Sequence, residues 1–231
     1  MPTLTRSYLE SLEVDTGVYV PQQDSDLLIE AATEPELITR ARALDFCTGS
    51  GVVAIALAQA GMAEVSAWDI CPRAVRCAQS NVCATGTQVH VRRGSLAEAV
   101  AEGPYDLVVS NPPYVPAPQP EQGQTVVTGA GPAWEWNAGE DGRLVLDPLC
   151  RVAGDLLAPG GSLLLVQSEF SGVDQTLAAL KASGLSAAVV MSRRIAFGPV
   201  LTARAAWLER TGRLEPGLRE EELVVIRADK S

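Results

Sequence analysis

Four consecutive residues, Asn111-Pro112-Pro113-Tyr114, have the types and the order needed to hold a flat nitrogen group. Proline fixes its own φ angle at about −65° and restricts the residue before it, so the Asn111 side chain and the Pro112 carbonyl group are held rigidly. Proline also lacks an N–H that would compete, and these two oxygens can accept both hydrogens of an NH₂ group. Fixed acceptors orient a poorly nucleophilic amide or aromatic amine nitrogen for attack, and Tyr114 can stack on it and offer its ring face to a cation. We therefore predict catalytic roles for Asn111, Pro112 and Tyr114, and substrate contacts for all four residues.

A glycine-rich turn, Asp45-Phe46-Cys47-Thr48-Gly49-Ser50-Gly51, follows the first predicted strand. Such turns lie at the carboxyl end of a parallel strand, where open α/β sheets bind ligands. Gly49 and Gly51 allow a close approach of the backbone to a ligand, and Asp69, at the end of the next strand, can accept hydrogen bonds from both ribose hydroxyls. The turn also fits the G-x-G-x-x-A fingerprint of nicotinamide dinucleotide sites. Asp45 favours S-adenosylmethionine instead, because a carboxylate suits a cationic sulfonium with an amino acid end, and hydride transfer has no use for Asn-Pro-Pro-Tyr.

Elements that would position these residues can be read from the alternation of short apolar strands with helices after residue 40, which is typical of βαβ units. The predicted strands span 42–46, 64–69, 88–92, 105–110, 162–167, 187–191 and 223–227. The predicted helices span 24–32, 34–40, 51–60, 72–83, 143–157, 172–182 and 200–210, and a turn is expected at 159–161. We expect an α/β fold with a doubly wound, mostly parallel sheet and helices on both faces. Residues 1–40 would form a short helical segment packed on the cofactor site, and residues 41–231 the main domain.

Composition limits the class of protein. The 231 residues, 47% apolar and 20% charged, fit a globular domain that needs neither a disulfide nor a metal for stability. No apolar run approaches the ~20 residues of a membrane span, and the first residues lack a signal-peptide pattern, so we expect a cytoplasmic protein. The net charge of −10 makes nucleic acid an unfavourable partner. Five cysteines without a C-x-x-C pair and a single histidine, His90, argue against disulfides and zinc, and no metal site is expected.

Taken together, the motifs resemble the HemK-like N5-glutamine methyltransferase family, whose members modify the glutamine of a Gly-Gly-Gln motif in peptide-release factors or act on a ribosomal protein. Six segments carry the resemblance: 17–25 (GVYVPQQDS), 45–51, Asp69, 111–114, 138–142 (AGEDG) and 157–161 (LAPGG). The resemblance implies a seven-stranded sheet in the order 3-2-1-4-5-7-6 and S-adenosylmethionine as cofactor. It places Ser25 and Asn111 beside the cofactor, Asp45 and Gly49 at its methionine and adenosine parts, and Asp69 at its ribose.

Three departures from the family pattern are visible. Cys47 stands where the family has the first glycine of its cofactor turn, and Ser95, followed by Leu96, stands where it often has an aspartate near the adenine. Cys47, Ser95 and Leu96 are still assigned to the cofactor site. We also expect a compact form that lacks the helical domain of the bacterial enzymes and resembles the archaeal and eukaryotic type, which works with a small partner subunit.

Alternatives to a protein glutamine N-methyltransferase remain open at this stage. Asn-Pro-Pro-Tyr also occurs in enzymes that methylate adenine, so a small metabolite or an adenine amino group is a second possible acceptor. A non-catalytic S-adenosylmethionine-binding protein is a third reading, which the residues at positions 47 and 95 keep open. Residues 111–142 form a long segment with six prolines, and within it residues 119–136 are expected either to set the choice of acceptor or to serve as a disordered connector.

Overall fold

The computed structural model describes residues 12–118, 127–128, 131–132 and 138–231. Seven strands form one sheet in the order β3-β2-β1-β4-β7-β9-β8, which confirms the predicted order, and all are parallel except β9, which runs antiparallel to both of its neighbours. The strands are β1 (Arg42–Phe46), β2 (Glu64–Asp69), β3 (His90–Arg93), β4 (Tyr105–Ser110), β7 (Leu157–Ser168), β8 (Ser186–Ala196) and β9 (Glu220–Asp229). A separate antiparallel pair, β5 (Val127–Thr128) and β6 (Gly131–Pro132), falls within residues 119–136, for which a role in acceptor choice or as a connector was expected. The rest of residues 119–136 and the first eleven residues lie outside the described chain.

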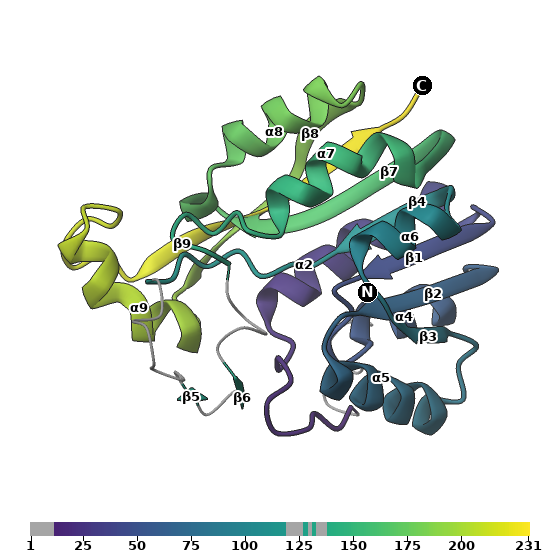
Figure 1. The fold of residues 1–231 in the computed structure, drawn as a ribbon, viewed down its shortest axis with the longest axis horizontal. Coiled ribbons are helices and arrows are strands. Elements are labelled where there is room, and N and C mark those ends of the chain that lie inside the picture. Colours follow the sequence, from purple (N-terminus) through teal and green to yellow (C-terminus); the bar gives the residue numbers. More distant parts are fainter. Residues whose placement is uncertain (1–11, 119–126, 129–130, 133–137) are drawn as a thin grey trace.

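Helices cover both faces of the sheet, as expected for a doubly wound fold (Figure 1). On one face α2 packs on α4 and α4 packs on α5, and on the other α7 lies between α6 and α8. The helices are α2 (Gln23–Ala32), α3 (Pro35–Ile38), α4 (Val52–Gln59), α5 (Pro72–Thr85), α6 (Leu96–Glu102), α7 (Leu146–Leu156), α8 (Val173–Ala182) and α9 (Pro199–Arg210), with a 3-10 turn at Glu169–Ser171. None of the helices in the described ranges is long and apolar enough to span a bilayer.

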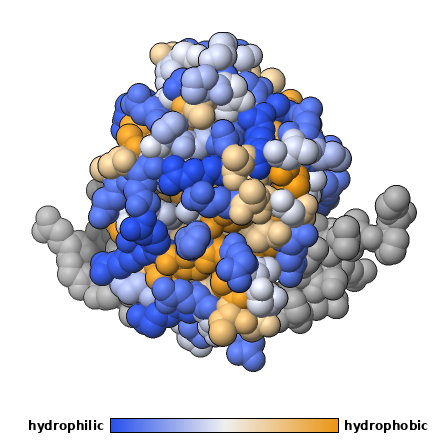
Figure 2. All heavy atoms as spheres, turned by 90° about the vertical axis from the view of Figure 1, so that its right-hand side faces the viewer, coloured by the Kyte–Doolittle hydropathy of each residue, from blue (hydrophilic) through white to orange (hydrophobic). Residues whose placement is uncertain are grey.

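The centre of the sheet is apolar on both faces, which is what a parallel sheet covered by two helical layers requires. In β4, residues 107–109 are fully buried, and in β7 residues 163–166 are at most 1% exposed. The amino ends of the parallel strands lie on the right in Figure 1, and hydrophilic and hydrophobic residues are interspersed on that side (Figure 2). Ligand chemistry is therefore sought at the opposite, carboxyl ends of the strands.

Two local features differ from the sequence expectation. Residues 159–161, expected as a turn, are included in β7. The pairing of β7 with β4 is nevertheless irregular at this point, because Leu157 pairs with Tyr105 and Ser162 pairs with Leu107. Helix α6 was not predicted. Ser95 begins it through a capping box, in which its side chain accepts from the Glu98 N–H and the Glu98 carboxylate accepts from the Ser95 N–H.

An insertion between β8 and β9 carries α9 and a second small apolar core. Leu201, Ala205 and Leu208 of α9 pack with Leu214 and are at most 4% exposed. This unit projects at the left of Figure 1, near the carboxyl end of β8 and the start of β9. It therefore borders the end of the sheet at which ligands are expected.

Candidate active site

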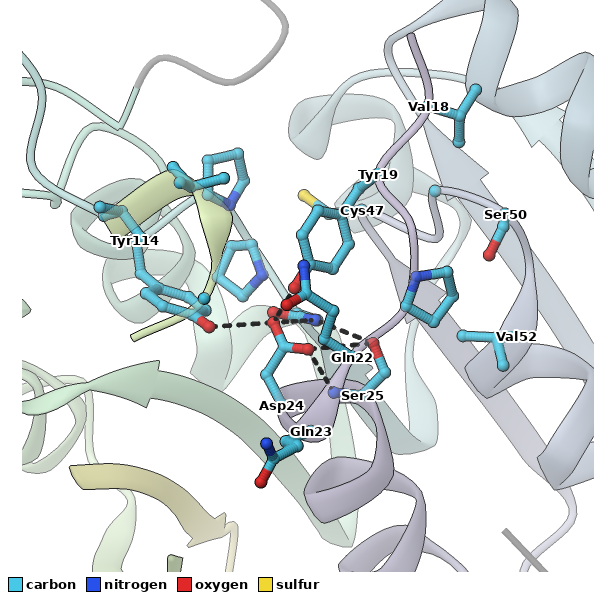
Figure 3. A pocket seen from close by; sticks show the side chains of 18 of the residues that line it. Val18, Tyr19, Gln22, Gln23, Asp24, Ser25, Cys47, Ser50, Val52 and Tyr114 are labelled. Atoms are coloured by element: carbon cyan, nitrogen blue, oxygen red, sulfur yellow. Dashed lines mark hydrogen bonds between the residues drawn. The ribbon is translucent and has the colours of Figure 1, made fainter. Parts of the chain in front are cut away.

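A cavity of about 510 Å³ opens at the carboxyl ends of the central strands, within the range usual for small-molecule sites. Its wall is formed by the start of α2 and the segment before it, the β1–α4 turn, the end of β2, the segment after β4, and the β8–α9 connection (Figure 3). The cavity brings together most of the predicted site residues: Ser25, Asp45, Cys47, Gly49, Asp69, Asn111, Pro112, Pro113 and Tyr114.

The β1–α4 turn has a left-handed backbone at three positions, with φ of 64° at Cys47, 56° at Gly49 and 84° at Gly51. Glycine adopts such angles freely, whereas a residue with a Cβ pays about 1–2 kcal/mol, so Cys47 strains the turn. A Cβ on Gly51 would lie 3.1 Å from the Cβ of Ala78, which means that Gly51 lets α5 pack closely. Gly51 is not among the residues that line the cavity. Burial raises the pKa of the Cys47 thiol well above its usual value, so the thiol is neutral.

Asp45 is a buried acid beneath the turn. Its Oδ2 accepts hydrogen bonds from the Thr48 hydroxyl at 2.6 Å and from the Ala54 N–H at 3.1 Å. Burial nevertheless raises the pKa of Asp45 to about 7, against the opposing effect of these two bonds. A cation bound nearby would favour the charged form and draw the pKa back down.

Asp69 connects the turns that follow β1 and β2. Its Oδ2 accepts from the Gly49 N–H at 3.0 Å and its Oδ1 from the Cys71 N–H at 2.9 Å. The side chain is partly exposed at the cavity wall. Both turns are thereby fixed relative to one carboxylate.

Asp24, at the start of α2, is the centre of a buried hydrogen-bond cluster (Figure 3). Its Oδ2 accepts from the Tyr19 hydroxyl at 2.8 Å, from the Tyr114 hydroxyl at 2.9 Å and from the Asn111 side chain at 3.1 Å. Its Oδ1 accepts from the N–H of Ser25 at 2.6 Å. One carboxylate thus connects the segment before α2 to the residues that follow β4.

The Asp24 carboxylate also decides how the Asn111 amide is oriented. A carboxylate only accepts, so Asn111 must turn its Nδ2 toward it, and the same Nδ2 also reaches the Ser25 hydroxyl at 3.4 Å. The Oδ1 atom is then the one left for a ligand. Such an arrangement offers a fixed acceptor beside Pro112 at the end of β4.

A glycine segment, 138–142, packs over the residues that follow β4. The Ala117 N–H donates to the Gly139 carbonyl at 2.9 Å. Gly142 has a φ of 77°, and a Cβ on it would lie 2.1 Å from the Tyr114 carbonyl oxygen, which no real contact allows. Only glycine permits this approach, and the segment thereby holds the backbone of Tyr114 in place.

The half of the cavity beyond β4 is lined by the end of β8, the start of α9 and β9. Here Glu221 is 4% exposed and its Oε2 has no hydrogen-bond partner. Burial, assisted by the charges of Asp24 and Glu169, raises the pKa of Glu221 to about 6, while a hydrogen bond from Ser168 opposes the shift. This carboxyl group is therefore available to a ligand.

Arg204 of α9 also lines this half, and its Nη1 donates to the carbonyls of Val115 at 2.6 Å and Pro116 at 3.2 Å. The contact joins α9 to the backbone immediately after Tyr114. Helix α9 therefore helps to hold the segment that carries the predicted acceptor site.

The charge of the cavity is mainly negative. Four carboxyl groups, those of Asp24, Asp45, Asp69 and Glu221, and one guanidinium, that of Arg204, are among the described residues that line it. Such a lining favours a cationic ligand and disfavours phosphate groups. Within the described ranges, no group of three or more His, Cys, Asp or Glu side chains is arranged to hold a metal ion.

The site predicted from the sequence differs from the site in the structure at six positions, of which Gly51 has been described above. Ser95 and Leu96 begin α6 and are not among the lining residues. Asp24, Gly142 and Glu221 were not singled out as site residues. Asp24 and Gly142 do lie in two of the quoted motif segments, and the aspartate directly before Ser25 was a usable signal; nothing local marks Glu221, which is one of three consecutive glutamates.

Comparison with known proteins gives a consistent picture. The family model of the methyltransferase small domain matches residues 14–133. The release factor glutamine methyltransferase of Deinococcus radiodurans is 37% identical over 156 residues, which cover 67% of this chain and 55% of that protein. The chain thus spans about half the length of this relative. A putative protein N5-glutamine methyltransferase of Methanocaldococcus jannaschii is 27% identical over 84% of this chain and 94% of its own length.

Among solved structures, the E. cuniculi Mtq2–Trm112 complex, described as responsible for methylation of the termination factor eRF1, contains a chain with the same fold. It superposes with a TM-score of 0.62 at 22% identity, covering 93% of this chain and 99% of that one. The likeness is one of architecture along almost the whole of both chains.

Proposed function

Since the chain belongs to the methyltransferase small domain family, we propose that it transfers a methyl group from S-adenosylmethionine to the side-chain amide nitrogen of a protein glutamine. The observation that carries the proposal is the Asp24–Asn111 contact at 3.1 Å. It orients the Asn111 amide with its acceptor oxygen available, which is what an NH₂ group needs as a partner.

The cavity fits the proposed cofactor in size and in charge. Its carboxyl groups suit a ligand that carries a sulfonium and an ammonium group, and its ≈ 510 Å³ is ample for such a ligand. Asp69 and the backbone at Gly49 would hold the ribose and adenosine side, and Asp45, Cys47 and Ser25 the methionine side. S-adenosylmethionine supplies, when bound, an electrophilic methyl group on a positively charged sulfur.

The protein's own contribution is to position the nitrogen. The Asn111 Oδ1 and the Pro112 carbonyl would each accept one hydrogen of the glutamine NH₂, which turns the nitrogen lone pair toward the donor side of the cavity. Tyr114, held by Asp24, would pack against the flat amide. Two preorganised acceptors also stabilise the positive charge that grows on nitrogen as the new bond forms.

A protein acceptor agrees with the relatives' names and with the charge of the chain. Release factors are the substrates named for the bacterial relatives, and a termination factor is named for Mtq2. We extend the proposal to a release factor as substrate in the cytoplasm and, by likeness to the Mtq2–Trm112 complex, to a small partner subunit. Purification of the tagged protein from its own cells tests for the partner subunit, which should copurify with it.

Methyl transfer tests the proposal directly. Purified protein should incorporate labelled methyl groups from S-adenosylmethionine into a release factor with an intact Gly-Gly-Gln motif and none into the same factor with Gly-Gly-Ala. Asn111→Ala should lower the rate by about 10²–10³-fold, as expected when one preorganised polar partner is removed. Gln79→Ala, at an exposed position of α5, is the matched control. Equal rates for the two variants, or equal labelling of the two factors, would contradict the proposal.

A further inference from the structure

Among the described residues that line the cavity, two have a buried side-chain oxygen without a hydrogen-bond partner, Ser50 and Glu221, and only Glu221 carries a carboxyl group. Glu221 is 4% exposed, it lines the cavity from β9, and its Oε2 has no hydrogen-bond partner. A buried carboxylate oxygen without a partner costs about 1–3 kcal/mol or more, so a free Oε2 in a ligand cavity indicates a ligand group that donates to it.

Its place in the sheet puts Glu221 on the acceptor side. Strand β9 is separated only by β7 from β4, which ends directly before Asn111, whereas the glycine turn follows β1 on the other side of β4. Burial raises the pKa of both Tyr19 and Tyr114, and the charges of Asp24 and Glu221 add to the shift, so the Glu221 carboxyl group lies close to the hydroxyl cluster around Asp24. Around it the wall is largely apolar, with Leu201 and Leu223 among its members.

The charged and titratable groups around Glu221, among the described residues, come from five parts of the chain. They are Tyr19 of the segment before α2, Asp24 of α2, Glu169 of the 3-10 turn, Tyr114 of the segment after β4 and Arg204 of α9, which also lines this half of the cavity. Ser168 of β7 donates a hydrogen bond. Because the Arg204 Nη1 is directed at two backbone carbonyls, the neighbourhood favours an N–H donor brought by the ligand.

We propose that Glu221 selects the acceptor by accepting, through its free Oε2, a hydrogen bond from a peptide N–H next to the glutamine that is methylated. This rests on the proposed function. A glutamine in a peptide brings backbone N–H groups near its side chain. The amino group of adenine is flanked by the ring acceptors N1 and N7, so a carboxylate at this place would repel it and leave these acceptors unpaired.

Two variants separate this role from a purely structural one. Glu221→Gln keeps the shape and one acceptor but removes the charge, and Glu222→Gln makes the same change at the adjacent position of β9, which is not among the residues that line the cavity. Neutralising a buried carboxyl group whose pKa is raised does not destabilise the fold, so both variants should melt and bind S-adenosylmethionine like the wild type.

The substrate is a synthetic Gly-Gly-Gln peptide, and its analogues carry an N-methyl group on each backbone nitrogen beside the glutamine in turn. For the unmodified peptide, Glu221→Gln should lower kcat/KM by about ten- to hundredfold, the loss of one charge-assisted hydrogen bond, mainly through KM. For the one analogue that lacks the recognised N–H, wild type and Glu221→Gln should have equal kcat/KM. Glu222→Gln should match the wild type throughout, and adenosine should not be methylated.

Three results would overturn the inference. The first is a kcat/KM for Glu221→Gln equal to that of Glu222→Gln on the unmodified peptide. The second is the same loss in Glu221→Gln for every analogue. The third is methylation of adenosine by the wild type. A wild type that binds the cofactor but methylates no glutamine peptide or release factor would instead refute the proposed function itself, so the two failures are distinguishable.

Discussion

Gly142 offers a quantitative test of how the acceptor segment is held. Alanine at this position would place a Cβ 2.1 Å from the Tyr114 carbonyl oxygen and 3.1 Å from the Ser171 Cβ. Because real Cβ contacts are not shorter than 3.0 Å, the Tyr114 carbonyl must move by about 1 Å. Gly160 is the matched control, since its φ of 75° is close to the 77° of Gly142 and nothing lies within 4 Å of a Cβ built on it.

Both alanine variants carry the cost of a left-handed non-glycine residue, about 1–2 kcal/mol. Gly142→Ala adds an overpacking cost of about 1–3 kcal/mol, so its total is about 2–5 kcal/mol. Urea denaturation, compared at equal m-values, measures the difference in the free energy of unfolding between the two variants. Methyl transfer should fall by about 10²-fold in Gly142→Ala, the effect typical of a 1 Å misplacement, and remain near wild type in Gly160→Ala.

The reasoning would be refuted by equal loss of stability in the two variants, because the collision with Tyr114 would then contribute nothing. Unchanged methyl transfer in a folded Gly142→Ala protein would show that the backbone position of Tyr114 does not matter for the reaction.

Three further perturbations address the cofactor side and the buried cluster. Asp24→Asn should lower the single-turnover rate of methyl transfer by about tenfold or more, because an amide at position 24 no longer forces Asn111 to present its Nδ2 at the 3.1 Å contact. An unchanged rate would contradict the role of Asp24 in orienting Asn111. The pKa of Asp45 is raised to about 7, so the contribution of Asp45 to the free energy of unfolding is full below the ordinary value of 3.8 and is lost as pH rises through 7. The affinity for a cationic cofactor should rise by up to about tenfold per pH unit between pH 5 and 7, and by less above pH 7. Calorimetry should detect proton release in wild type but not in Asp45→Asn, and a flat affinity profile would argue against the assignment. Cys47→Gly should raise the free energy of unfolding by about 1 kcal/mol, since the φ of residue 47 is 64°, and a lower free energy of unfolding would refute the strain argument. A thiol reagent should modify the exposed Cys83 before Cys47.

Local backbone chemistry explains what could be predicted from the sequence. The alternation of apolar strands and helices specified a covered parallel sheet, and two consecutive prolines marked Asn111 as a rigid position directly after the fourth strand. The glycine turn after β1 was recognisable because Gly49 needs a φ of 56° there. Each of these signals depends on residues that are neighbours in the chain, and residue type alone restricts their conformations.

Contacts over long sequence separations were not accessible in this way. Asp24 meets Asn111 across 87 residues and Tyr114 across 90, and only the packing of α2 against the end of β4 brings them together. Ser95 is a local case that the sequence did carry: Ser95 and Glu98 have the capping-box pattern, and Ser95 caps α6, whereas its predicted place beside the cofactor stays a prediction.

The amino-acid sequence by itself determined the fold class, the strand order through its family resemblance, and the two motifs at the ends of β1 and β4. Only the tertiary structure showed which carboxyl groups line one cavity and that Glu221 lines it with an Oε2 that has no hydrogen-bond partner. It also showed that the backbone of Gly142 packs directly against the Tyr114 carbonyl group. The physical reason is that turn and strand preferences act over a few residues, whereas burial and hydrogen-bond partners depend on which elements the sheet brings side by side.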